Sequence, residues 1–121
     1  LETLDTLYAK GVSLGVASNR DRPAKILAKL GIDKYFKAVV GQFDVKRVKP
    51  APDMILKAME LLGAKPSETL YVCDSKGDIT AAGAAEVKAL AMTTGGHSKE
   101  ELSKLGAWRT ADRLKEVLAC F

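Results

Sequence analysis

Short apolar segments alternate with amphipathic helices along this sequence, and no other feature limits the possible folds as strongly. The strand candidates are residues 12–17, 38–40, 69–73 and 87–92. The helix candidates are residues 23–30, 53–62, 79–85, 98–105 and 114–118. Strands that alternate with helices over short loops predict an α/β fold, in which helices cover both faces of a parallel sheet.

Several residues mark where these helices should begin and end. Pro23 suits the first turn of a helix, while Gly31 and Gly63 each follow an apolar stripe, where a left-handed residue ends a helix. Ser98 and Glu101 have the spacing of a capping box. These signals support the predicted boundaries independently of the apolar pattern.

The composition is that of one globular domain, which we assign to residues 1–121. Of these 121 residues, 47% are hydrophobic and 28% are charged, which is enough for a core and excludes a disordered chain. No apolar run approaches the roughly 20 residues of a membrane helix, and the first residues do not form a secretion signal. We therefore expect a cytoplasmic protein. Cys73 and Cys120 lack the spacing of metal ligands and are expected to be ordinary thiols.

The net charge of +4 is dispersed along the chain. The densest basic stretch, residues 46–49, holds three cations and no interleaved aromatic residues. A nucleic-acid surface would combine clustered cations with aromatic rings on which bases stack. We expect a solvated surface, with neither nucleic acid nor membrane as a partner.

Polar residues follow two of the strand candidates at the point where each strand ends. Ser18 and Asn19 follow the first strand, while Asp74, Ser75 and Asp78 follow the third. Ligands of open parallel sheets bind beyond the carboxyl ends of the strands, so these residues are the candidate site. Two carboxylates facing one space repel each other unless a cation lies between them, and Mg²⁺ is the natural cation for oxygen ligands. The alternative is that one of these residues only caps the following helix.

Two further residues have competing interpretations. Ser18 either donates its hydroxyl to an anion or caps the next helix. Lys49 is followed by Pro50 and Pro52, so a rigid loop could direct its ammonium to a phosphate, although a lone lysine is usually a solvated surface residue. His97 lies in a glycine-containing loop, and we assign it no catalytic role.

Three motifs stand in order along the chain. They are Ser18-Asn19 after a strand, Lys49-Pro50-x-Pro52-Asp53, and Tyr71-Val72-Cys73-Asp74-Ser75-x-x-Asp78. In order and spacing they resemble motifs two, three and four of the haloacid dehalogenase-like phosphatases, and most of all the phosphoglycolate phosphatase-like branch of that family. The resemblance spans nearly the whole chain.

The resemblance implies a three-layer Rossmann-like fold and Mg²⁺-dependent hydrolysis of a small phosphorylated metabolite through an aspartyl-phosphate intermediate. By analogy with the family, Ser18 hydrogen-bonds the transferring phosphoryl group, Lys49 neutralises its charge, and Asp74 and Asp78 hold or support Mg²⁺. We assign phosphate binding to Ser18, Asn19 and Lys49. Phosphoryl transfer depends mainly on positioning and charge stabilisation, which agrees with these roles.

The nucleophile motif of the family, at the end of its first and central strand, is missing from the chain. Asp5 does not replace it, because Leu1, Leu4, Leu7 and Tyr8 fall on one helical face and make Asp5 a helix surface residue. We therefore expect residues 1–121 to be the C-terminal part of an incomplete core that also lacks the cap domain. Without the nucleophile the chain alone should be inactive, while the longer protein would be the phosphatase.

Two other positions depart from the family. Cys73 stands where glycine is usual before the fourth-motif acid, and Glu86 stands where glycine is usual at the helix end. A side chain at position 73 would crowd the turn if the backbone there needs a positive φ or a close approach, and this would affect the metal geometry.

Two alternative functions compete with the phosphatase. The chain could be a non-catalytic phosphate- or metal-binding half that assembles with another chain or with its own copy, because a missing central strand exposes unpaired edges. A receiver domain resembling response regulators is the third option. Its paired acids would come at the first strand, which does not fit Lys49 before Asp74.

Overall fold

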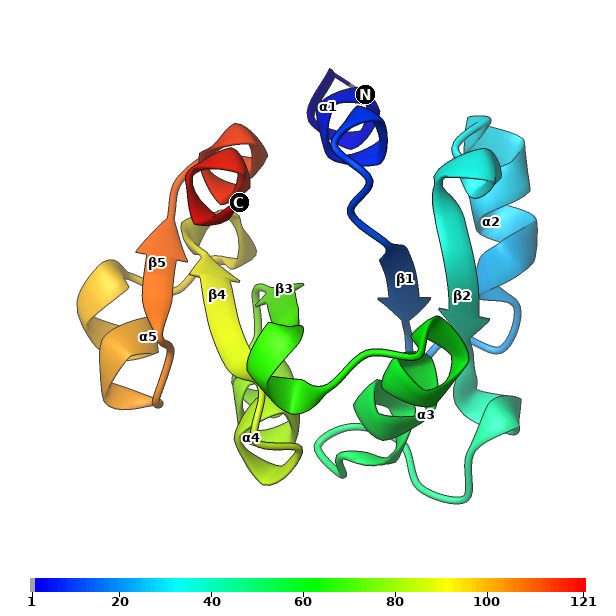
Figure 1. Cartoon of the computed structure of the whole chain (residues 1–121). Helices are drawn as coiled ribbons and strands as arrows, with labels where there is room; N and C mark the ends of the chain where they lie inside the picture. The colour runs from blue at the N-terminus through cyan, green and yellow to red at the C-terminus, as the bar shows by residue number, and fades with distance from the viewer. Residues whose placement is uncertain (1) are drawn as a thin grey trace.

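The structure is a computed structural model that describes residues 2–121 (Figure 1). Its strands are β1 (Leu14–Ala17), β2 (Phe36–Val40), β3 (Leu70–Cys73), β4 (Lys88–Met92) and β5 (Arg109–Ala111). Its helices are α1 (Glu2–Ala9), α2 (Pro23–Leu30), α3 (Asp53–Leu62), α4 (Lys76–Ala84) and α5 (Lys99–Lys104), and short 3-10 turns lie between them. The α/β fold class is confirmed. Leu1 lies outside the described residues.

All strand pairs are parallel, but they form two separate sheets. One sheet has the order β1-β2 and the other the order β3-β4-β5. Between residues 2 and 121 no strand pairs with the facing edges of β1 and β3, which lie on either side of the gap in Figure 1. The expected parallel sheet that lacks its central strand is therefore what the structure contains.

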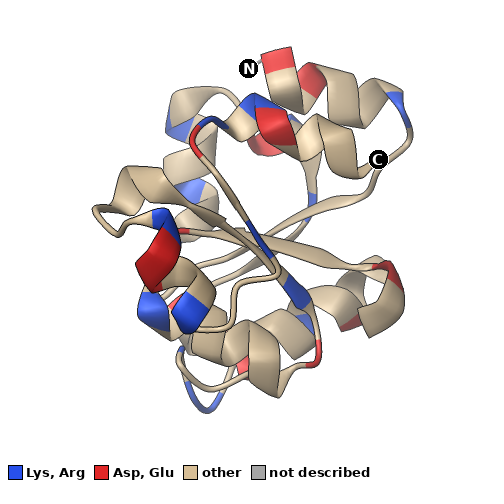
Figure 2. Ribbon diagram, turned by 90° about the vertical axis from the view of Figure 1, so that its left-hand side faces the viewer, with Lys and Arg blue, Asp and Glu red and all other residues tan. Residues whose placement is uncertain are grey.

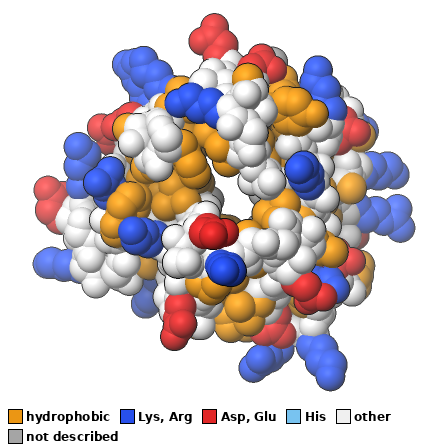
Figure 3. Space-filling model, in the orientation of Figure 1, with side chains coloured by type: hydrophobic (Ala, Val, Ile, Leu, Met, Phe, Trp, Pro, Cys, Tyr) orange, Lys and Arg blue, Asp and Glu red, His pale blue; other side chains and the backbone are white. Residues whose placement is uncertain are grey.

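A groove of about 780 Å³ separates the two sheets. Its walls come mainly from α1, β1, α3, β3 and the C-terminal residues 114–121, and they are largely apolar. Figure 3 shows the molecule hollowed at this place, with hydrophobic side chains around much of the opening. The groove has the place and the lining that an additional apolar strand would need.

The core is built from two clusters of buried side chains. In the first, Ile55 and Met59 of α3 pack with the alanines of α4 and with strands β3 and β4, and Ala81 and Ala82 are fully buried. The small side chains of α4 permit this close packing. In the second cluster, Leu7 of α1 and Val117 pack with β4 and β5. Helix α3 also contacts β1 and β2, so it connects the two sheets.

The helix ends follow the predicted signals at most positions. Gly31 and Gly63 have left-handed φ values of 71° and 66° and end α2 and α3, and the Ser98–Glu101 capping box is present. Glu86 also has a left-handed φ of 60°, just after α4. This conformation explains physically why glycine would suit the position.

Two features of the secondary structure differ from the prediction. Helix α4 begins at Lys76 instead of residue 79, because the Ser75 hydroxyl accepts a hydrogen bond from the Asp78 amide and caps the helix earlier. Strand β5 was missed, since its three residues carry no apolar pattern. The expected short helix at residues 114–118 is present as a 3-10 helix over Leu114–Cys120.

Figure 2 shows that Lys, Arg, Asp and Glu residues are scattered over helices and loops, in agreement with the dispersed charge of the sequence. Within residues 2–121, the helices are too short to cross a bilayer.

Candidate active site

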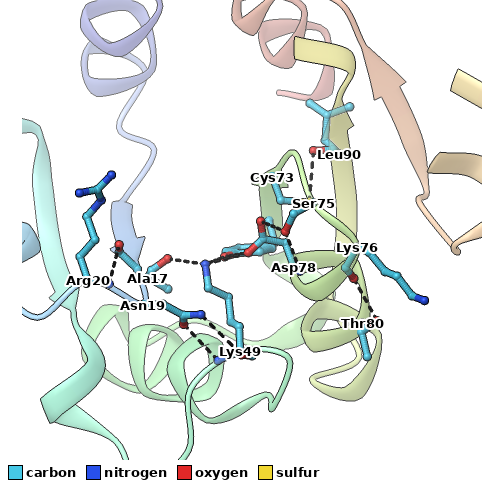
Figure 4. A network of polar contacts seen from close by, with 12 residues as sticks. Ala17, Asn19, Arg20, Lys49, Cys73, Ser75, Lys76, Asp78, Thr80 and Leu90 are labelled. Carbon is cyan, nitrogen blue, oxygen red and sulfur yellow. Dashed lines mark hydrogen bonds and ion pairs between the residues drawn. The ribbon is translucent and has the colours of Figure 1, made fainter. Parts of the chain in front are cut away.

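The carboxyl ends of β1 and β3 meet at a cavity of about 300 Å³, close to the loop that precedes α3 (Figure 4). Its lining residues are Ala17, Lys49, Tyr71, Val72, Cys73, Asp74, Asp78, Met92 and Thr94. Lys49, Asp74 and Asp78, which lie far apart in the sequence, are thus brought together as predicted. The rule that ligands bind beyond the carboxyl ends of parallel strands locates this cavity correctly.

Lys49 is held inside the structure and is not a solvated surface residue. Its side chain is 14% exposed, and its Nζ lies 2.7 Å from Asp78 Oδ1. Nζ also donates to the Ala17 carbonyl oxygen at 3.1 Å and to the Tyr71 hydroxyl at 3.0 Å. All three donors of the ammonium are therefore engaged, and its positive charge is fixed at the cavity wall.

Asp78 lies in the first turn of α4 and is 9% exposed. Its Oδ2 accepts a hydrogen bond from the Ser75 hydroxyl at 2.7 Å, and its Oδ1 accepts one from the Tyr71 hydroxyl at 3.1 Å. Burial raises the pKa of Asp78, but the hydrogen bonds from Lys49, Ser75 and Tyr71 outweigh it and leave the pKa below its usual value. Asp78 is consequently an anion, and Ser75 is the residue that caps the helix.

Asp74 is exposed and lines the same cavity from the turn between β3 and α4. Gly95 packs closely against it. A methyl group at Gly95 would overlap the Asp74 carbonyl oxygen and lie 2.8 Å from Asp74 Cβ. The Asp74 turn can therefore lie in its present place only because Gly95 has no side chain.

Tyr71 and Cys73 line the cavity, although sequence analysis gave neither of them a role. Burial, and then the nearby Asp78 carboxylate, raise the pKa of Tyr71 strongly, so its hydroxyl stays protonated. Burial also raises the pKa of Cys73 to about 12, with further contributions from Asp78 and Asp74. Cys73 therefore remains a neutral thiol. Residue 73 has the extended backbone of strand β3, and its side chain packs in the core. The position therefore does not have the left-handed φ that would favour glycine.

Ser18 and Asn19 lie next to the cavity but are not among its lining residues. The Ser18 hydroxyl accepts a hydrogen bond from the Arg20 amide at 3.2 Å, and α2 begins without a side-chain cap, so Ser18 is not a helix cap. Asn19 holds the backbone of Lys49. Its Oδ1 accepts from the Lys49 amide at 3.2 Å, and its Nδ2 donates to the Lys49 carbonyl at 3.5 Å.

Two groups of the cavity wall suit Mg²⁺ as ligands, the carboxylates of Asp74 and Asp78. Asp74 is free of the ion pair that occupies Asp78, and carboxylate oxygens are the ligands that Mg²⁺ prefers. Within residues 2–121, no three His, Cys, Asp or Glu side chains come close enough together to hold a metal ion. Mg²⁺ sites typically use one or two carboxylates together with water and substrate oxygens, so two are sufficient in number.

In a parallel α/β architecture of this kind ligands bind beyond the carboxyl ends of the strands, which is where Lys49, Asp74 and Asp78 lie. The family model of haloacid dehalogenase-like hydrolases matches residues 1–92. The chain belongs to this family, and its sequence places it in the phosphoglycolate phosphatase-like branch.

Individual relatives support the assignment to this family. Phosphoglycolate phosphatase of Escherichia coli strain K12 is 43% identical over 96 residues, which cover 78% of this chain and 38% of the relative. A HAD-superfamily hydrolase of subfamily IA from Geobacter sulfurreducens superimposes with a TM-score of 0.85 at 31% identity, over 99% of this chain and 57% of that protein. The chain thus spans less than two thirds of the length of these relatives.

Proposed function

We propose that the protein to which this chain belongs is a Mg²⁺-dependent phosphomonoester hydrolase that acts through an aspartyl-phosphate intermediate. The observation that carries the proposal is the cavity in which Lys49 and the two carboxylates of Asp74 and Asp78 meet. Phosphoryl transfer needs fixed positive charge beside the phosphoryl oxygens more than it needs reactive side chains. The held ammonium of Lys49 is a group of this kind.

In the proposed mechanism each residue has one task. Lys49 offsets the negative charge of the phosphoryl group, with its backbone held by Asn19 and its ammonium held by Asp78. Ser18, at the end of β1, donates its hydroxyl to a phosphoryl oxygen, with Asn19 beside it. The placement of Ser18 and Asn19 outside the cavity lining means that a bound phosphate would have to extend toward β1.

Mg²⁺ would be held by Asp74 and supported by Asp78. When bound, it would neutralise charge on the phosphoryl group during transfer. Asp78 already carries an ion pair and two hydroxyl hydrogen bonds, so its contribution would be to keep the N-terminal turn of α4 and Lys49 in place.

We propose that the nucleophilic carboxylate belongs to a part of the longer protein that residues 1–121 do not include. Asp74 and Asp78 are the acidic residues that line the cavity within residues 2–121; Asp74 is assigned to the metal, and Asp78 is engaged by Lys49, Ser75 and Tyr71. Asp5 lies on the exposed surface of α1, where its carboxylate accepts a hydrogen bond from Tyr35. An aspartate carried by a strand in the groove between β1 and β3 would reach the cavity at the carboxyl end of that strand.

The experiment is a phosphatase assay on the purified chain with an aryl phosphate and Mg²⁺. We expect no turnover above background, because the chain lacks the nucleophile. Turnover that disappears with a chelator and in Asp74→Asn would contradict the assignment of the nucleophile to an absent segment. The substrate class proposed for the whole protein is a small phosphorylated metabolite, such as phosphoglycolate in the relatives, in the cytoplasm.

A second candidate function is a non-catalytic half that assembles with another chain or with its own copy. The unpaired edges of β1 and β3 and the apolar groove between them favour it. Sedimentation at increasing protein concentration tests this candidate: association is the expected result, and a stable monomer whose melting does not respond to Mg²⁺ would contradict it. Neither nucleic acid nor membrane is a proposed partner.

A further inference from the structure

The Tyr71 hydroxyl joins side chains that come from separate parts of the fold. Tyr71 belongs to β3. Lys49 lies in the loop before α3 and Asp78 in α4, as Figure 4 shows. The hydroxyl accepts a hydrogen bond from Lys49 Nζ at 3.0 Å and donates one to Asp78 Oδ1 at 3.1 Å. The Lys49 ammonium also contacts the Ala17 carbonyl oxygen of β1, so these contacts cross the mouth of the groove.

The chemistry of a phenol suits this position. A hydroxyl has one donor and two acceptor sites, so it can satisfy an ammonium and a carboxylate together. Burial and the neighbouring Asp78 raise the pKa of Tyr71 well above its usual value, which keeps the donor present at neutral pH. The ring also lies beside the ammonium, with Lys49 Nζ 5.8 Å from the ring centroid.

We propose that Tyr71 is a positioning residue that holds the Lys49 ammonium against the cavity wall, where it faces a bound phosphoryl group. The inference rests on the proposed function. A lysine side chain has four rotatable bonds and loses much conformational freedom when it is fixed. With Tyr71 in place, the ammonium has three acceptors on three sides and occupies one position.

The test is Tyr71→Phe in the 121-residue chain, which removes the hydroxyl and leaves the ring. We expect the affinity for inorganic phosphate, titrated by NMR in the presence of Mg²⁺, to fall about three- to tenfold. The same variant should also weaken the Lys49 ammonium signal in a proton–nitrogen NMR spectrum, because one of the three acceptors of the ammonium is lost. Tyr8→Phe is the matched control, since Tyr8 is exposed on α1 outside the cavity, and it should change neither quantity.

The outcomes separate the two proposals. If the unmodified chain does not bind phosphate, the phosphate site assigned to Ser18, Asn19 and Lys49 of this chain fails, and the role of Tyr71 toward phosphate fails with it. If the unmodified chain binds phosphate and Tyr71→Phe binds it equally or more tightly, only the role of Tyr71 is overturned. Weaker binding with an unchanged Lys49 ammonium signal would also overturn it, because the hydroxyl would then not act through the Lys49 ammonium.

If Tyr71→Phe does not fold, a measurement on the unmodified chain tests whether the Lys49 ammonium is held in one position. Ammonium protons with three fixed acceptors exchange with water more slowly than those of an exposed lysine. We expect Lys49 to give an observable ammonium signal in a proton–nitrogen NMR spectrum under conditions in which exposed Lys25 gives none. A Lys49 signal that is averaged away like that of Lys25 would overturn the proposal.

Discussion

The Lys49 ammonium lies 2.7 Å from Asp78 Oδ1, and the two side chains are 14% and 12% exposed. This ion pair joins the loop before α3 to the first turn of α4, across the mouth of the groove between the two sheets. Because the pair is largely shielded from water, removing one partner leaves a charge without compensation. The pair therefore matters for stability as well as for the proposed chemistry.

Lys49→Met and Asp78→Asn should each lower the free energy of unfolding by about 1–3 kcal/mol. The double variant should lose less than the sum of the two, by roughly 1 kcal/mol, because each single change already breaks the same pair. Urea denaturation measures all three values. Arg47→Met is the control: Arg47 pairs with Asp53 at 3.2 Å but is 73% exposed, and its loss should hardly change stability. Strict additivity at Lys49 and Asp78 would show that the pair contributes nothing.

The stability of the chain should depend on pH through Asp78. The folded-state pKa of Asp78 lies below its usual value of 3.8, so the folded state binds this proton less readily than the unfolded state. The resulting stabilisation is present above the unfolded pKa and is lost as the pH falls through the folded pKa. Unfolding curves for the unmodified chain and Asp78→Asn should differ most near neutral pH and should converge as the pH falls below the unfolded pKa and through the folded pKa. A difference that is independent of pH would contradict the shift.

Glu86→Gly should stabilise the protein by about 1 kcal/mol. Glu86 adopts a left-handed φ of 60° just after α4, and this conformation strains any residue with a Cβ. Gly31→Ala, at a φ of 71° after α2, should have the opposite sign and serves as the control. Thermal melting of both variants measures the effect. If Glu86→Gly is destabilising, the Glu86 side chain contributes contacts that outweigh its backbone strain.

Gly95→Ala should weaken Mg²⁺ binding at Asp74. The added methyl would lie 2.8 Å from Asp74 Cβ and would overlap the Asp74 carbonyl oxygen, so the turn has to move. Gly83→Ala is a matched control, because a Cβ at Gly83 of α4 would meet no atom within 4 Å. A Mg²⁺ titration followed through the Asp74 resonances measures the affinity. Equal affinity in both variants would mean that Asp74 does not need its present position to hold the ion.

Much of the fold was predictable because the local signals agree with the tertiary structure. The apolar segments before Ser18 and Asp74 became β1 and β3, and Gly63 ended α3 at the expected residue. The parallel-sheet rule then placed Asp74 and Asp78 at one rim. In contrast, β5 pairs with β4 through backbone hydrogen bonds, and its three residues have no period that could reveal it.

The contacts that organise the site were not predictable in the same way. Sequence spacing could not show that the Asn19 amide holds the Lys49 backbone, or that Tyr71 bridges Lys49 and Asp78. The contacts of Lys49 with Asn19 and with Tyr71 join residues 30 and 22 positions apart, so they exist only after the chain has folded. A tyrosine in the strand that precedes two acids was the one available signal for Tyr71, and strand tyrosines are too common for that signal to be specific.

The most direct test of the account is phosphate release by a chimera in which this chain replaces the matched 96 residues of E. coli phosphoglycolate phosphatase. The rest of the relative then supplies the segments that the chain lacks. The account predicts Mg²⁺-dependent hydrolysis of an aryl phosphate, reduced by about 10²-fold or more in Lys49→Met. A folded chimera that releases no phosphate, or one that is unaffected by Lys49→Met, would contradict it.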